Sequence, residues 1–148
     1  MMSAIFAFLH HLAAFTLVAA LAVEFVLIRG ELTLANARSL QHADIAFGIA
    51  AGAILIIGLL RVFYFEKGAE YYFSSHTFLA KLTVFAVVGL ISIIPTIEFL
   101  SWRKSVAQGN LPVVSPAKLR RLRMIIHIEL AGIVVILLCA ALMGRDIG

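Results

Sequence analysis

The sequence predicts an all-α integral membrane protein, a four-helix bundle forming a single domain over residues 1–148. Two features of composition and one of patterning predict this fold class. Hydrophobic residues make up 63% of the chain and charged residues 14%, whereas a soluble domain has roughly 45–50% and 25%. The mean hydropathy is +1.07. The apolar residues gather in four runs, each close to the ~20 residues that cross a bilayer.

The four expected helices cover about residues 4–28, 45–65, 78–100 and 118–143. Backbone groups in lipid must be paired internally, and no run alternates like a barrel strand, so each run is interpreted as a helix. We expect the first run to remain a membrane span and not a cleaved signal peptide, because no basic residue precedes it and it stays apolar as far as Ile28. Gly109, Pro112 and Pro116 indicate a loop before the last helix.

Basic residues predict the orientation in the membrane. The first and third connections hold most of them, namely Arg29, Arg38, Arg103, Lys104, Lys118, Arg120, Arg121 and Arg123. By the positive-inside rule, these connections are cytoplasmic. We therefore expect a multi-pass protein of the bacterial inner membrane with both termini periplasmic. The net charge of +4 is accounted for by these loops, and we expect a lipid bilayer and no nucleic acid as the partner.

Two small residues predict how helices associate. Gly48 and Gly52 lie four apart in the second run, a spacing that allows close helix contact. This contact can lie within one bundle or between chains, and we expect a homo-oligomer.

Ionisable residues inside the apolar runs fall into two groups by depth. The outer group, near the predicted periplasmic side, comprises His10, His11, Arg61, His76 and Lys81. The inner group comprises Glu24, Asp44, Glu98, His127 and Glu129. Such residues are costly in a membrane, by about 2.5–3.5 kcal/mol each on insertion scales, so they normally face the bundle interior and mark a pathway or cofactor. Because Glu98 follows Pro95, which can kink its helix, we expect it to point toward Glu24 or His127.

A histidine on the first helix and cations at the same depth predict a haem b site. A haem between bundle helices uses a neutral imidazole as axial ligand, and Arg or Lys near the surface matches its propionates. The predicted metal ligands are His10 and, at the second position, His76 or Lys81. Arg61 is a predicted cofactor-binding residue, and His127 is the candidate for a second, inner site.

Four stretches carry a resemblance to known proteins: FLHHLAAFTLVAALAVEFVLIR, DIAFGIAAGAILIIGLLRVFYFEKG, YYFSSHTFLAKLTVFAVVGLISIIPTIEFLSWRK and RMIIHIELAGIVVILL. They resemble an uncharacterised family of four-span bacterial inner-membrane proteins. More distantly, the layout is similar to HemJ-type protoporphyrinogen IX oxidases, which bind haem. That resemblance implies that His10 and Lys81 form a functional pair.

Two functions are expected from these observations. The first is an inner-membrane b-type haem protein, a candidate haem-dependent oxidoreductase acting in electron transfer or porphyrin redox chemistry, with a quinone or porphyrin as partner. The alternative is a small proton-coupled transporter or channel-like bundle without haem. In that case Glu24, Glu98, His127 and Glu129 would form a relay.

Overall fold

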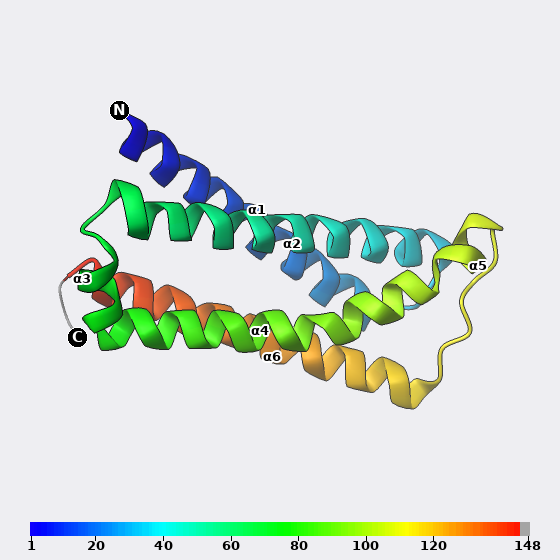
Figure 1. Ribbon diagram of the computed structural model, residues 1–148. Helices are drawn as coiled ribbons and strands as arrows, with labels where there is room; N and C mark the ends of the chain where they lie inside the picture. The colour runs from blue at the N-terminus through cyan, green and yellow to red at the C-terminus, as the bar shows by residue number, and fades with distance from the viewer. Residues whose placement is uncertain (146–148) are drawn as a thin grey trace.

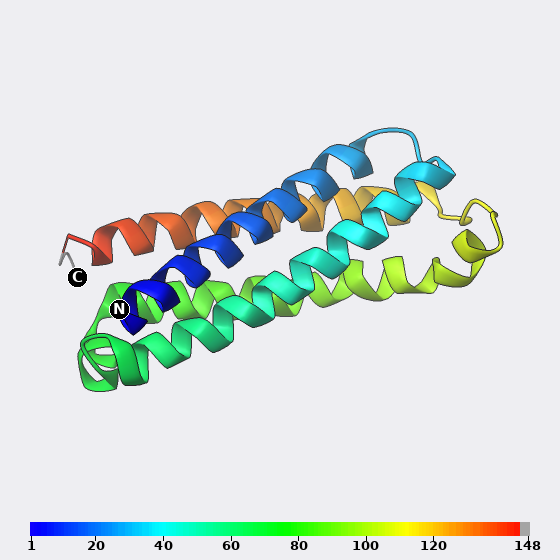
Figure 2. The same ribbon diagram turned by 90° about the horizontal axis from the view of Figure 1, so that it is seen from above.

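Four long helices run along one axis in the computed structural model, which describes residues 1–145 (Figures 1 and 2). They are α1 (Met2–Arg29), α2 (Leu34–Leu60), α4 (His76–Ser101) and α6 (Pro116–Met143). A π-helical turn, η1 (Arg61–Phe65), continues α2. Two short helices, α3 (Ala69–Ser74) and α5 (Arg103–Ala107), lie at opposite ends of the molecule (Figure 1). The all-α bundle predicted from the sequence is confirmed.

Side-chain caps explain where three of the long helices begin. The Thr33 hydroxyl accepts a hydrogen bond from the Asn36 amide at 3.1 Å, which starts α2 well before the predicted residue 45. The polar stretch at 37–44, which lies between the first two predicted helices, is therefore helical, because a capped N-terminus stabilises a turn that hydropathy alone does not reveal. Ser75 and Ser115 cap α4 and α6 in the same way, and Pro116 occupies the first turn of α6.

The helices form two hairpins that pack side by side. α1 packs against α2 and α6, while α4 packs mainly against α6 and less closely against α2. α1 and α4 are therefore diagonal to each other. α4 contains Pro95 and changes direction in its C-terminal part (Figure 1), as expected when a proline removes an i→i−4 hydrogen bond.

The two ends of the bundle differ in packing. We call the end that holds α3 and the N-terminus the terminal end, and the end that holds α5 the loop end (Figure 1). The best-buried apolar side chains concentrate toward the loop end: Ile28, Ala37, Leu40, Phe99, Trp102, Leu122 and Ile126. At the terminal end the first turns of α1 are exposed, and the helices enclose a cavity.

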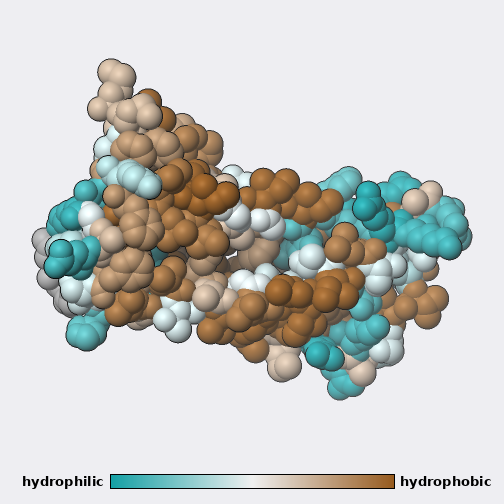
Figure 3. Space-filling model, viewed as in Figure 1, coloured by the Kyte–Doolittle hydropathy of each residue, from teal (hydrophilic) through white to brown (hydrophobic). Residues whose placement is uncertain are grey.

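All four long helices are long and apolar enough to cross a membrane, over Met2–Arg29, Leu34–Phe65, His76–Ala107 and Pro116–Met143. Hydrophobic residues cover the middle of the face shown in Figure 3, and hydrophilic residues gather toward both ends. Many large apolar side chains point outward, among them Ile49, Val87, Leu90 and Leu138. This distribution is that of a multi-pass membrane protein, whose outer surface meets lipid.

Candidate functional site

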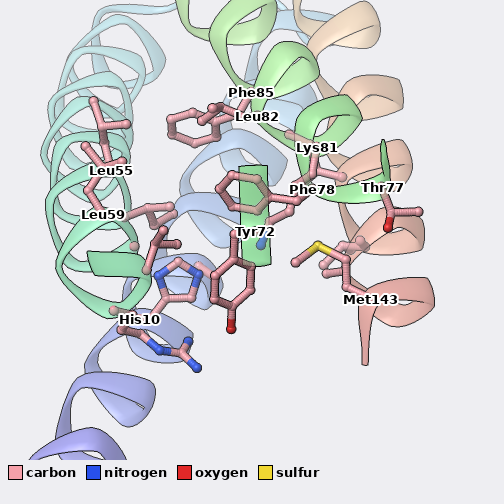
Figure 4. Close-up of a pocket in the computed structure, with 18 of the residues that line it drawn as sticks. His10, Leu55, Leu59, Tyr72, Thr77, Phe78, Lys81, Leu82, Phe85 and Met143 are labelled. Carbon is pink, nitrogen blue, oxygen red and sulfur yellow. The ribbon is translucent and has the colours of Figure 1, made fainter. Parts of the chain in front are cut away.

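A cavity of about 640 Å³ lies between the helices at the terminal end. All four long helices contribute to its wall, together with η1 and α3. This volume falls within the range of small-molecule and cofactor pockets, about 300–1,000 Å³. Figure 4 shows that apolar and aromatic side chains form most of the wall and that a few polar side chains lie among them.

His10 of α1 is the histidine at the centre of this site. Its ring lies against the backbone of α2, where a Cβ at Gly58 would come within 3.4 Å of Cε1 and 3.7 Å of Nδ1. Nδ1 is buried and has no hydrogen-bond partner in the described part of the chain. A buried polar atom without a partner is costly, by about 1–3 kcal/mol. The described residues therefore leave Nδ1 of His10 without a partner, although they hold the ring in place.

Two cations accompany His10 in the cavity wall. Lys81 lines the cavity from α4, the helix diagonal to α1 (Figure 4). Both Lys81 and Arg61 lie close enough to His10 to interact with it electrostatically. Arg61 also forms a salt bridge, in which Nη2 lies 2.7 Å and Nε 3.2 Å from Oε1 of Glu66. This end of the cavity is consequently positively charged and would attract an anionic group.

Aromatic side chains form one wall of the cavity. The rings of Tyr72 and Phe78 are 5.3 Å apart at their centroids, and Phe85 lies deeper on α4 (Figure 4). Burial raises the pKa of the Tyr72 phenol, and the nearby Glu66 carboxylate raises it further. Tyr72 therefore presents a neutral hydroxyl next to a flat apolar surface.

The cavity continues toward the middle of the bundle as an apolar hollow of about 200 Å³. Leu17, Leu55, Phe85 and Ile133 line both spaces. The rest of the hollow lies between α2 and α4, the pair of neighbouring helices that packs least closely. The loose α2–α4 contact thus leaves room beside the main cavity, and Figure 3 shows the surface hollowed in this region.

Two of the predicted cofactor ligands, His76 and His127, lie outside the cavity wall. His76 is exposed at the start of α4 and is not part of the wall. His11, which lines the cavity mouth, bonds through Nδ1 to the Ala7 carbonyl at 2.6 Å. His127 is exposed on α6, with its ring 6.1 Å from that of Phe25. Of the predicted cofactor ligands, the fold brings together His10, Arg61 and Lys81.

Carboxyl groups gather in the other half of the bundle, but not in the expected set. Glu24, Asp44 and Glu129 are buried together. The expectation that Glu98 points toward Glu24 or His127 was wrong. Glu98 accepts a hydrogen bond from Trp102 Nε1 at 2.9 Å and pairs with Lys118 Nζ at 3.3 Å. The bend at Pro95 therefore turns Glu98 toward the loop end.

Sequence reasoning missed the part that Gly58 plays in the site. Because Gly58 has no side chain, the His10 ring can touch the backbone of α2. The sequence does not show which glycine of α2 faces His10, since this depends on how α1 packs against α2. The π-helical turn that places Arg61 was missed as well. Such turns are frequent at functional sites, but they have no simple signature in a single sequence.

The comparisons with known proteins agree with this architecture. A family model described as a predicted membrane protein, DUF2214, matches residues 2–148. No curated protein and no solved structure matches the sequence, so the similarity to HemJ-type oxidases stays a prediction. Because the family model covers nearly the whole chain, the protein belongs to the DUF2214 family of predicted membrane proteins.

Proposed function

We propose that this protein is a b-type haem protein of the bacterial inner membrane that acts in electron transfer or porphyrin redox chemistry. The observation that carries the proposal is the position of His10, which lines a 640 Å³ cavity opposite Lys81 and whose buried Nδ1 has no hydrogen-bond partner among the described residues. An axial histidine of a b-type haem needs a lone pair directed at the iron and a fixed ring. Contact with α2 at Gly58 fixes the ring.

The remaining wall fits the other parts of a porphyrin. The aromatic and aliphatic side chains suit the faces of a flat macrocycle, and Arg61 suits one of its carboxylates. Lys81 is the candidate for the second axial position, because it lines the cavity whereas His76 is exposed outside it. An amine binds a metal only through its lone pair, so Lys81 must release its proton before it can bind.

The bound haem would supply one-electron redox chemistry, and the protein would supply ligation and a dry environment. Arg61, already paired with Glu66, would hold one edge of the macrocycle near the membrane surface. The apolar hollow beside the cavity suits the tail of a quinone, which we propose as the redox partner. A porphyrin oxidised at this site, as the similarity to HemJ-type oxidases implies, is the other candidate partner.

We infer that both termini are periplasmic and that the loop end is cytoplasmic. The basic residues of the first and third connections all belong to the loop end. Arg103, Lys104, Lys118, Arg120 and Arg121 are exposed there, in the position that the positive-inside rule assigns to the cytoplasm.

We also propose that the protein forms a homo-oligomer through α2. Nothing lies within 4 Å of a Cβ built at Gly48 or Gly52, so these small residues are not used in close packing within the described chain. Ile45 and Ile49 are exposed beside them. A helix of a second copy could approach this face closely. Chemical crosslinking in nanodiscs should give a dimer that Gly48→Leu weakens, and crosslinks unaffected by this substitution would contradict the proposed interface.

Haem content per chain tests the proposed function. The protein is purified in detergent from haem-replete cells, and its Soret absorbance and pyridine haemochrome are measured. We expect His10→Ala to lose most of the haem, whereas the matched control His11→Ala keeps it, because His11 is satisfied by the Ala7 carbonyl. Lys81→Ala should change the spectrum, and His76→Ala and His127→Ala should not.

Two results would overturn the haem proposal. One is full haem content in His10→Ala. The other is a colourless wild-type preparation, which would favour the alternative of a proton-coupled transporter or channel-like bundle.

A further inference from the structure

Three carboxyl groups from three helices meet in the half of the bundle toward the loop end. We call Glu24 of α1, Asp44 of α2 and Glu129 of α6 the carboxyl cluster. Their residues are 1%, 6% and 1% exposed. The carboxyl groups of Glu24 and Asp44 adjoin each other, and Glu129 lies close enough to both to interact with them electrostatically. The carboxyl cluster is thus a site built by the fold, since these residues are distant in sequence.

The fourth long helix completes the site. Thr96 of α4 donates a hydrogen bond from Oγ1 to Oδ1 of Asp44 at 3.0 Å. Every long helix therefore contributes a polar group at this position. Even so, Oε1 of Glu24 and Oε1 of Glu129 are buried and have no hydrogen-bond partner among the described residues. Two buried carboxyl oxygens without a hydrogen-bond partner are energetically costly unless a proton or another ligand is bound to them.

Neighbouring basic residues do not neutralise the cluster, because each is either bonded elsewhere or exposed on the surface. Arg123 donates from Nε to the Ile28 carbonyl at 2.7 Å. Lys118 pairs with Glu98. His127 on α6 is exposed beside Phe25, and His42 on α2 is also exposed. Three ionised carboxylates with no counter-charge cannot persist in a membrane interior, so a positive species must be taken up at the site.

A proton suits this site better than a metal ion does. Within residues 1–145, no set of three or more His, Cys, Asp and Glu side chains is arranged to hold a metal. Moreover, two adjoining carboxyl groups both accept hydrogen bonds when ionised, so Glu24 and Asp44 can bond to each other only if one of them carries a proton.

We propose that the carboxyl cluster is a proton-binding site, at which Glu24 and Asp44 share one exchangeable proton and Glu129 carries another. This site is separate from the haem cavity. His10 and Glu24 are both on α1, and at a rise of 1.5 Å per residue their Cα atoms lie about 21 Å apart. The inference does not depend on haem, because none of the three residues lines the cavity.

Infrared spectroscopy of the purified protein in nanodiscs tests the proposal. A protonated carboxyl group gives a C=O stretching band that is absent for a carboxylate and moves to lower frequency in D₂O. We expect the wild-type protein to show this band at neutral pH and to lose it when the sample is made strongly alkaline. Glu24→Gln, Asp44→Asn and Glu129→Gln should each remove part of it.

Two further variants separate this site from carboxyl groups elsewhere in the chain. Glu70→Gln, at an exposed position of α3, should leave the band unchanged. Thr96→Val should shift the band without removing it, because it deletes one hydrogen bond to Asp44.

Three results would overturn the proposal. They are absence of the band in the wild-type protein at neutral pH, a band that all three cluster substitutions leave intact, and a band that disappears when sodium replaces choline at constant pH. The last result would identify an alkali cation as the ligand. If one substitution prevents folding, the wild-type spectra in H₂O and D₂O still decide whether the carboxyl groups hold protons.

Discussion

The His10 ring lies directly against the α2 backbone at Gly58. A Cβ at this glycine would be 3.4 Å from Cε1 of the ring and 3.7 Å from Nδ1. Nε2 lies beyond 4 Å of that point. The glycine therefore sets the position of the imidazole relative to the cavity.

Enlarging Gly58 should displace His10. We expect Gly58→Leu to lower haem content per chain to nearly that of His10→Ala, and Gly58→Ala to lower it less, because 3.4 Å requires only a small shift of the ring. The measurement is the pyridine haemochrome assay on purified protein. Gly48→Ala is the matched control on the same helix, where an added Cβ meets nothing within 4 Å. Equal haem content in Gly58→Leu and wild type would contradict this role.

Gly132 permits the close packing of α4 against α6. A Cβ at this position would overlap Cγ2 of Val88. Gly132→Ala should therefore reduce the free energy of unfolding by about 1–3 kcal/mol, even though alanine favours a helix by about 1 kcal/mol. Thermal unfolding in detergent, followed by circular dichroism, measures the change.

A second substitution checks the cause of that loss. Val88→Ala in the Gly132→Ala background should restore part of the stability, because it removes the overlapping methyl group. Gly89→Ala, where an added Cβ has open space, should not destabilise the protein. A Gly132→Ala protein that is as stable as the wild type would show that α4 and α6 can separate without cost.

Glu98 links α4 to α6 at the loop end through Trp102 and Lys118. Glu98→Gln should keep the hydrogen bond from the indole and lose the ion pair. We expect a stability loss below about 1 kcal/mol, because the Lys118 side chain is 52% exposed. Glu98→Ala should in addition shift the emission of Trp102, the single tryptophan of the chain. Unchanged fluorescence in Glu98→Ala would contradict the indole contact.

The orientation of the chain can be read from single cysteines in a Cys139→Ala background. Cysteine at Asn110, in the loop after α5, should be protected from an impermeant thiol reagent added to intact cells. Cysteine at Lys67, between η1 and α3, should react. The physical reason is the excess of basic residues at the loop end. The opposite labelling pattern would reverse the sides of both polar sites.

Tyr72 should ionise at a higher pH than a solvent-exposed tyrosine. Burial in the cavity wall raises its pKa, and the Glu66 carboxylate adds to the effect. The difference in tyrosinate absorbance between wild type and Tyr72→Phe isolates this one group during an alkaline titration. Glu66→Gln should move the isolated transition to lower pH. A transition at the ordinary tyrosine value would show that the phenol is fully hydrated.

The sequence by itself determined the class of the protein and its number of spans. Four long apolar runs allow only helices in a bilayer, since every backbone group must find its partner within the segment. The same reasoning predicted that ionisable residues in those runs face inward, which holds for several of them but not for His127. His10, Lys81 and Glu24 do lie at the cavity or in the core, because exposing them to lipid is costly.

Only the tertiary structure decided which inward residues meet. Depth along each helix can be counted from the sequence, but rotation about the axis and the choice of neighbours depend on side-chain packing between helices. For the alternative function, the sequence predicted a relay of Glu24, Glu98, His127 and Glu129. The fold instead places Asp44 with Glu24 and Glu129 and leaves His127 outside. The pairing of His10 with Gly58 also depends on contact between α1 and α2, which no periodicity within a single helix specifies.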